Sequence, residues 1–318
     1  MKQTTLILSL IVALTCSVSA ADKKKQEKKP VAGKKATPTA AKPKPAAKKP
    51  AAKKPAAKKP TPKPAPKSVF PDKNLEQAVR AQVFAKRHTK DPLTAADIAQ
   101  VAVVRGNKMG IKSLAGLEHC RALASLDLAE NEIVDLSPIK GLPRLQQLIL
   151  HHNKVRSVAP LADNRALQYI DLNQNDVTDL KPLGMLTNMS VLYLSDNSVN
   201  DISPILKLPR LHSIYLNNNG LVSLSGINQL KWLSSLSASG NKLKDLHDLT
   251  GLENLSFLFL EGNQIADINP LLKMLKGDYE GKQRFSPFIR IYLDGNPLNG
   301  KAKAGMKSFT KKYHTRFK

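Results

Sequence analysis

The amino-acid sequence predicts an α/β-type solenoid, built from short stacked units that each contribute one strand to a parallel β-sheet. Two observations carry this prediction. An asparagine recurs every 22 residues, and leucines stand at fixed distances before each one. The series is Asn131, Asn153, Asn175, Asn197, Asn219, Asn241 and Asn263, followed after 33 residues by Asn296. Eight copies in register predict a repeat architecture.

The chain begins with the pattern of a secretory signal peptide over residues 1–20. Lys2 is followed by an apolar stretch, Leu6–Leu14, and by small residues that end at Ala20, where we expect cleavage. The apolar stretch is too short to cross a bilayer core about 30 Å thick as a helix. The sequence therefore predicts an exported protein in the periplasm, on the cell surface or outside the cell, with no membrane span after cleavage.

A stalk is predicted over residues 21–67, which contain 17 Lys and 10 Pro against two acidic residues. This segment has too little apolar surface to offset the entropy of folding, so we expect it to be disordered. It could act as a spacer, which we favour, and it could also bind an anionic polymer through its charge. The segment has no aromatic residue, so no specific nucleic-acid readout is expected.

A helical N-terminal cap is predicted over residues 68–100. An amphipathic pattern runs from Phe70 to Arg80, and Thr94 is placed to cap a second short helix that includes Ile98. A cap is needed at this point because the open end of a solenoid exposes its apolar core.

The repeats run over residues 101–298. Each follows the frame Leu-x-x-Leu-x-Leu-x-x-Asn-x-Ile, as in the unit from Leu123 to Ile133. The Leu-x-Leu alternation predicts a short strand with its leucines inward. The asparagine turns the chain out of the strand, and its amide can satisfy backbone groups that the turn exposes. This is the leucine-rich repeat signature, with an asparagine ladder along the stack. Cys120 stands at an apolar position of the frame, which predicts a buried thiol.

The return segments between strands have only eleven residues, too few for a full α-helix with its turns. They favour extended or 3-10 conformations, because prolines recur at one position: Pro138, Pro160, Pro182, Pro204 and Pro270. The predicted fold is a right-handed horseshoe with the sheet on its concave face. Asn164 replaces a leucine of the frame and suggests a weak point or a water site. An 11-residue excess around 275–287 is expected to protrude as a loop.

A basic C-terminal cap or tail is predicted over residues 299–318, which hold seven basic residues and no acidic one. Within it, Ala302–Tyr313 is expected to form a helix over the last unit. Residues 68–298 carry 25 basic against 23 acidic side chains, so nearly all of the formal charge of +25 belongs to the two ends. That distribution argues against a folded nucleic-acid-binding domain.

The segments Phe70–Arg80 and Leu93–Asp97 resemble the N-terminal cap of internalin-type bacterial leucine-rich repeat proteins. The returns Asp135–Ile139 and Asp201–Ile205 are similar to those of the same family. The resemblance covers residues 69–298, and because better-known members are adhesins and surface recognition proteins, it implies a binding function. The sequence departs from the wall-attached members, since no Leu-Pro-x-Thr-Gly sorting signal follows the repeats. The ligands of the family are therefore not carried over.

Aromatic side chains occupy outward positions of the predicted strands and should therefore line the concave face. They are Tyr169, Tyr193, Tyr215, Phe257, Phe259 and Tyr292. Exposed aromatics on a rigid sheet are typical of interface hot spots, although strand propensity alone also favours aromatics. We predict that these residues, together with Asp171 and Asp196 on the same face, bind a ligand.

The predicted function is therefore protein–protein recognition through a concave aromatic face, by an exported leucine-rich repeat protein. The alternative is an envelope-associated structural tether that binds anionic polymers through its polybasic tails. The sequence contains no nucleophile elbow, zinc helix or carboxylate pair at a convincing spacing, and His151-His152 is interpreted as a pair of surface histidines. No enzyme activity, cofactor or metal site is predicted.

Overall fold

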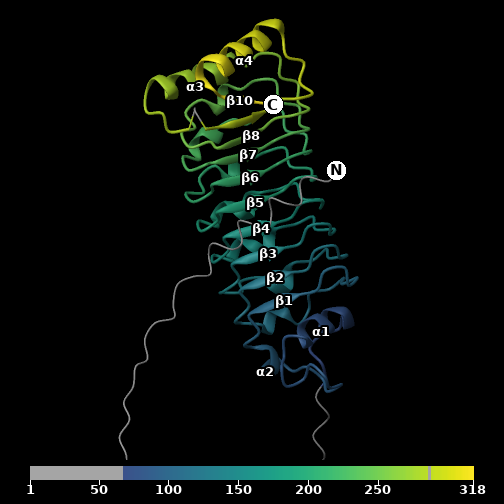
Figure 1. The fold of residues 1–318 in the computed structure, drawn as a ribbon. Coiled ribbons are helices and arrows are strands. Elements are labelled where there is room, and N and C mark those ends of the chain that lie inside the picture. Colours follow the sequence, from purple (N-terminus) through teal and green to yellow (C-terminus); the bar gives the residue numbers. More distant parts are fainter. Residues whose placement is uncertain (1–66, 286–287) are drawn as a thin grey trace, which may run out of the picture. The chain divides into compact units, whose positions relative to one another are not determined.

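The computed structural model describes residues 67–285 and 288–318. The predicted signal peptide and residues 21–66 of the predicted stalk lie outside the described residues. The described part contains ten strands in a single parallel sheet, and they follow one another in chain order (Figure 1). They are β1 (Val103–Arg105), β2 (Ser125–Asp127), β3 (Gln147–Ile149), β4 (Tyr169–Asp171), β5 (Val191–Tyr193), β6 (Ser213–Tyr215), β7 (Ser235–Ser237), β8 (Phe257–Phe259), β9 (Arg290–Tyr292) and β10 (Arg316–Phe317). This arrangement confirms the predicted leucine-rich repeat solenoid.

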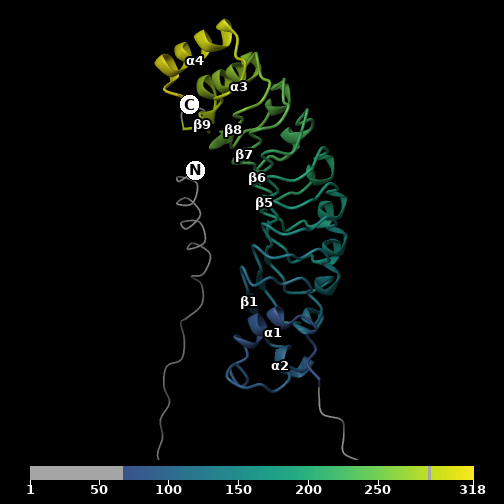
Figure 2. The same cartoon turned by 90° about the vertical axis from the view of Figure 1, so that its right-hand side faces the viewer.

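The register of the sheet follows the length of the repeat. Leu126 pairs with Leu148, 22 residues later, and Leu258 pairs with Ile291 across the one longer step. Central residues from β1 to β9 are fully buried, because each points away from the outward columns into the stack. In the described part of the chain, the sheet lines the inner side of the curved stack and the return segments line its outer side (Figure 2).

The predicted asparagine ladder is present. The Asn175 side-chain amide donates to the carbonyl oxygens of Leu150 (3.0 Å), Leu172 (3.0 Å) and Asn173 (3.1 Å), and its oxygen accepts from the Val155 N–H (2.9 Å). One side chain therefore satisfies backbone groups of two successive units.

The turn at each ladder asparagine has the same backbone geometry. The preceding residue has a left-handed φ, which is 53–57° at Glu130, His152, Gln174, Asp196 and Asn218 and 64–74° at Gly240, Gly262 and Gly295. Left-handed backbone costs a non-glycine residue about 1–2 kcal/mol, so the ladder bonds must offset that cost in five units.

The predicted 3-10 returns are also present. They are η2 (Leu117–His119), η3 (Ser137–Ile139), η4 (Ala159–Asp163), η5 (Lys181–Met185), η6 (Ser203–Ile205), η7 (Ile227–Gln229) and η8 (His247–Leu249). In η3 to η6 the recurring proline lies at one of the first two positions, where its missing N–H leaves no helical bond unmade.

The prediction of a protruding loop around 275–287 was wrong for residues 275–280. Residues Asn269–Glu280 form an α-helix, α3, whose Leu271, Leu272 and Leu275 are buried. The longer return has room for three helical turns, and its apolar residues recur at helical spacing, so the helix packs onto the end of the stack instead of projecting from it.

The expectation of a weak point or a water site at Asn164 was also wrong. This side chain is fully buried, donates to the Ile139 carbonyl (2.9 Å) and accepts from the Gly141 N–H (3.1 Å). Asn164 therefore bridges two units, as the ladder asparagines do, on the return side of the stack.

At the N-terminal end, helices stand where the sequence predicts them: α1 (Lys73–Arg80) and α2 (Ala95–Ile98). The Asp72 carboxylate accepts from the Asn74 and Leu75 N–H groups of its own helix and from the Lys112 and Ser113 N–H groups of the first repeat. This single carboxylate thus ties α1 to the solenoid.

Asp97 gives the N-terminal end a predictable acid sensitivity. Its Oδ2 lies 2.7 Å from Lys86 Nζ and accepts a hydrogen bond from the Thr94 N–H. The contact with Lys86 has the largest effect, and together the two contacts lower the Asp97 pKa from its ordinary 3.8 to about 2. Because the folded pKa is depressed, the stabilisation is present above pH 4 and is lost as the pH falls toward 2. Asp97→Asn should cost about 1 kcal/mol at pH 7 and less at pH 2.5, measured by urea unfolding. An equal cost at both pH values would contradict this assignment.

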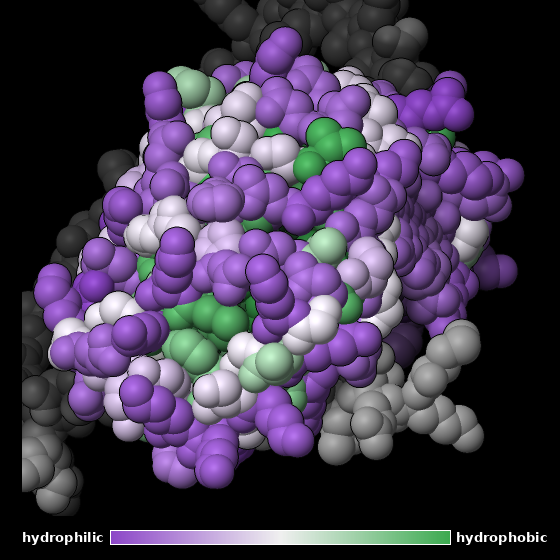
Figure 3. Space-filling model, turned by 90° about the horizontal axis from the view of Figure 1, so that it is seen from above, coloured by the Kyte–Doolittle hydropathy of each residue, from purple (hydrophilic) through white to green (hydrophobic). Residues whose placement is uncertain are grey.

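At the C-terminal end, α4 (Gly300–Tyr313) covers the last repeat and leads into β10, which the sequence does not predict. β10 joins β9 through hydrogen bonds from Lys318 N to Ile291 O (2.8 Å) and from Leu293 N to Lys318 O (2.7 Å). Figure 3, which views this end, shows mostly hydrophilic residues with small apolar areas between them. The helix therefore presents a polar surface where the stack would otherwise end on apolar side chains.

Cys120 is fully buried, and burial together with the nearby Glu118 raises the pKa of its thiol to about 12. We expect this thiol to be unreactive toward Ellman's reagent at pH 8 in the folded protein and to react fully in guanidinium chloride. The measurement needs a chain without residues 1–20, because Cys16 is the other cysteine of the sequence. Rapid labelling of the folded chain would show that this part of the stack opens readily.

Candidate functional site

The six predicted aromatics lie on the outward columns of the sheet and form two clusters. The first cluster is Tyr169, Tyr193 and Tyr215 on β4, β5 and β6. The ring centroids of Tyr169 and Tyr193 are 5.6 Å apart and tilted, and those of Tyr193 and Tyr215 are 4.4 Å apart and stacked. All three rings are half-buried, so each packs on its neighbours and still offers part of its surface.

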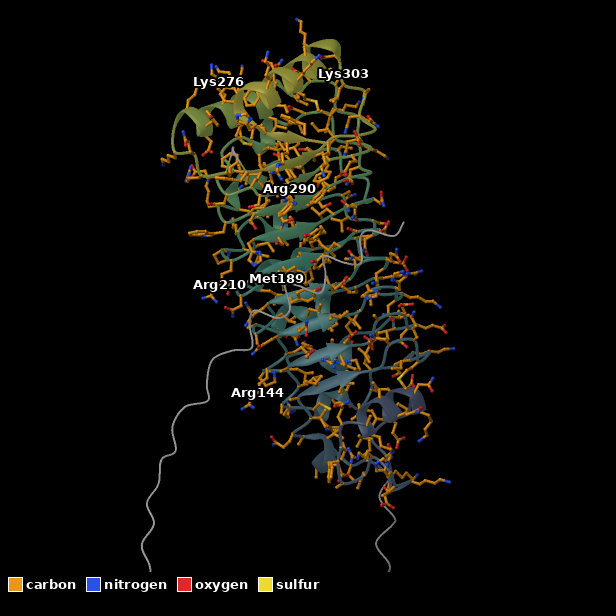
Figure 4. All side chains as sticks on the ribbon, in the orientation of Figure 1. Arg144, Met189, Arg210, Lys276, Arg290 and Lys303 are labelled. Carbon is orange, nitrogen blue, oxygen red and sulfur yellow. The ribbon has the colours of Figure 1, made fainter. Side chains whose placement is uncertain are left out.

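The second cluster is Phe257, Phe259 and Tyr292 on β8 and β9. Phe259 stacks on Tyr292 with centroids 4.6 Å apart, and Phe257 is the most open of the described concave aromatics. Two cations border this cluster: the Arg290 guanidinium lies 5.5 Å from the Phe257 ring and Lys318 Nζ lies 5.6 Å from the Tyr292 ring. Figure 4 shows Arg290 on the sheet, well inside its edges.

A serine strand separates the two clusters. Ser235 and Ser237 of β7 are both buried, and Ser235 Oγ lies 3.2 Å from the Tyr215 hydroxyl. Both serines stand at outward positions of the predicted strand, but the sequence does not reveal that they are buried in the folded sheet. The predicted aromatic stripe is therefore two separate clusters. The cations of the second cluster were not predicted as site residues, although Arg290 stands in one of the outward columns.

The two predicted acidic residues lie in different settings. Asp171 is buried in β4, and that burial raises the pKa of its carboxyl, although the Asn173 N–H donates to it at 3.0 Å. Asp196 is exposed in the left-handed turn after β5 and accepts from the Asn218 side chain (2.8 Å). Asp171 thus belongs to the surroundings of the tyrosine cluster, and Asp196 lies at the edge of the face.

Burial, followed by the negative charge of Asp171 and by the neighbouring phenols, raises the pKa of Tyr169, and burial and Tyr215 raise that of Tyr193. Both hydroxyls are therefore neutral across the physiological range. The cluster offers ring faces and neutral hydroxyl groups, which suits binding.

His151 and His152 lie beside this region, with their Nδ1 atoms 3.0 Å apart. Within residues 67–285 and 288–318, no group of three His, Cys, Asp or Glu side chains is placed to hold a metal ion.

Comparisons with known proteins agree with the leucine-rich repeat fold. A family model described as leucine-rich repeats in two copies matches residues 121–163, 165–207 and 187–229. The crystal structure of internalin C2 from Listeria monocytogenes is similar, with 33% identity over 64% of this chain and 89% of that chain and a TM-score of 0.61. The functional domain of InlJ from the same organism, which includes a cysteine ladder, is 19% identical over 75% of this chain and 54% of that chain, with a TM-score of 0.51. A leucine-rich repeat protein from Leptospira interrogans is 22% identical over 64% of this chain and 56% of that chain, with a TM-score of 0.50. These last two show similarity of fold alone.

Proposed function

This chain belongs to the internalin-type leucine-rich repeat proteins, and from that premise we propose that it is exported and recognises a protein partner through its two concave aromatic clusters. The leucine-rich repeats form a protein–protein interaction domain.

The stacking of the aromatic rings is the observation that carries this proposal. Tyr193 and Tyr215 are held against each other on adjacent strands, as are Phe259 and Tyr292, so their rotamers are fixed before a partner arrives. Fixed side chains lose little conformational entropy on binding. Half-exposed tyrosines on a rigid surface have the composition and the preorganisation typical of interface hot spots.

Export is supported by the N-terminal pattern of the sequence, with its short apolar stretch and small residues ending at Ala20. Among the residues that the structure describes, every helix is too short or too polar to cross a bilayer. We propose that the protein acts in the periplasm, on the cell surface or outside the cell, and that it is a binding protein without enzymatic activity.

The test is affinity capture from envelope and host-cell extracts at moderate salt, with the chain lacking residues 1–20 as bait. A triple variant, Tyr193→Ala, Tyr215→Ala and Phe259→Ala, removes one or two rings from each cluster. The matched control, Val134→Ala, Met185→Ala and Val222→Ala, removes exposed apolar side chains away from the concave columns.

We expect at least one protein to be retained by the wild type and the control and lost with the concave variant. The concave proposal fails if both variants retain the same proteins as the wild type. Material that all three baits retain and that a higher salt concentration then releases would instead favour the tether, with binding through the polybasic ends.

A further inference from the structure

One edge of the solenoid carries a row of cations that the concave site does not use. The row lies where the chain enters each strand, one or two positions before the first apolar residue of the repeat frame. Over six consecutive units its residues are Arg121, Arg144, Arg165, Asn188, Arg210 and Lys231. We call the five cations of this row the entry ridge. With strands about 4.8 Å apart, five steps span roughly 24 Å. Figure 4 shows Arg144 and Arg210 reaching outward from the same edge.

The entry ridge is preorganised by Asn188, the one uncharged residue of the row. Asn188 Nδ2 donates to the Arg165 carbonyl oxygen (2.9 Å), and Asn188 Oδ1 accepts from the Arg210 guanidinium (3.0 Å). Arg165 in turn donates to the Met185 carbonyl oxygen (2.9 Å). These contacts fix two guanidinium groups through neutral oxygen atoms, so the groups are positioned while their charge stays uncompensated.

The carboxylates near this edge are engaged by other groups. Glu118 accepts from the Gly116 N–H, Asp163 pairs with Lys140, and Glu253 pairs with Arg284. In the described part of the chain, none of the five ridge cations is within salt-bridge distance of an acidic side chain.

On the opposite edge, where the chain leaves the strands, several cations form salt bridges with acidic side chains. There Lys108 pairs with Glu130, Lys154 with Glu132 and Arg156 with Asp176. A row of cations that makes no salt bridge, on an edge where acidic side chains do not alternate with it, indicates a surface that fits an anionic partner.

Trp232, the only tryptophan of the sequence, is 67% exposed beside Lys231. A shallow depression next to it is lined by Leu206, Pro209 and Gln229. The ridge therefore ends at one flat apolar ring with a hollow beside it.

We infer that the entry ridge is a second binding surface, which takes an extended acidic polysaccharide with Trp232 against one of its sugar rings. Guanidinium groups match carboxylate and other planar or tetrahedral anions with paired hydrogen bonds, and a linear polymer presents such groups repeatedly along the length of the ridge. A nucleic acid is a poorer fit, because one aromatic ring gives no platform for successive bases. An acidic peptide is also a poorer fit, since the ridge offers a single apolar anchor where protein interfaces use several. This surface is separate from the aromatic clusters and does not depend on their function.

The single tryptophan makes the inference testable even though the lysine-rich N-terminal segment also attracts anions. Polygalacturonate, a carboxylated polysaccharide, is titrated into the chain lacking residues 1–20 while Trp232 fluorescence is followed. The ridge variant is Arg144→Gln, Arg165→Gln and Arg210→Gln. The control, Arg156→Gln, Lys242→Gln and Lys244→Gln, makes the same change in net charge with exposed residues of the opposite edge. Neutral dextran, single-stranded DNA and polyglutamate are titrated in parallel.

With the wild type at low salt, we expect polygalacturonate to change the fluorescence saturably. The ridge variant should reach half-saturation at a roughly tenfold higher polymer concentration, and the control variant at nearly the same concentration as the wild type. Dextran should give no response. The inference is overturned if the wild-type tryptophan does not respond, or if both triple variants weaken equally, since binding would then follow net charge alone. Tighter binding of DNA or polyglutamate than of polygalacturonate would assign the ridge to that class of partner instead.

Discussion

Asn175→Ala should lower the free energy of unfolding by about 3–5 kcal/mol, one of the two largest effects that we expect from a single substitution in this chain. The substitution removes the donors to three carbonyl oxygens and the acceptor for the Val155 N–H. Asn175 is buried, so water reaches these groups poorly and each unsatisfied group costs about 1–3 kcal/mol. The measurement is urea unfolding followed by circular dichroism.

The matched control for this substitution is Asn200→Ala. Asn200 is exposed in the same region of the stack and makes no side-chain hydrogen bond among the described residues. We expect its replacement to change stability by less than about 0.5 kcal/mol. Equal effects of the two substitutions would mean that the ladder contributes little and that leucine packing alone holds the units together.

The sequence predicts the ladder and the strands well because both follow from a strict period. Each unit has the same neighbours before and after it, so one frame fixes the strand, the buried leucines and the asparagine turn of every copy. The 3-10 returns follow for the same reason, since a proline recurs in the same place in several of them.

Deviations from the period were predicted less well. Residues 275–280 of the loop expected around 275–287 belong to the helix α3, because burial of Leu271 and Leu275 depends on the end of the stack against which they pack. The weak point expected at Asn164 is a satisfied polar bridge, because its partners belong to the preceding unit. Both errors come from judging a segment by its own residues when a neighbouring unit decides its environment.

The candidate site also has a part that the sequence predicts and a part that it does not. Its aromatic residues could be assigned to the concave face from strand alternation alone. Their grouping into two clusters depends on the buried serines of β7. The cations of the second cluster include Lys318, which reaches Tyr292 only because β10 extends the sheet. The short strand β10 does not follow the repeat frame, so the sequence does not predict it.

Phe309→Ala in α4 should lower the free energy of unfolding of the C-terminal end by about 3 kcal/mol. Phe309 is buried and its ring centroid lies 4.4 Å from that of Tyr313, which in turn contacts the Tyr279 ring of α3 at 4.6 Å. Truncating the ring removes apolar contacts that hold α4 to the end of the stack, and β10 follows α4 directly in the chain.

A repeat protein is stabilised by contacts between neighbouring units, so this loss should stay near the end of the stack. In hydrogen exchange, we expect the amides of α3, α4 and the β9–β10 pair to exchange at least tenfold faster in Phe309→Ala. Amides of β3 to β5 should keep the rates of the wild type. Lys311→Ala, an exposed change in the same helix, is the control and should alter neither set. If exchange instead quickened uniformly along the chain, the solenoid would unfold as one cooperative unit, and α4 would stabilise the concave face as a whole as well as its C-terminal cluster.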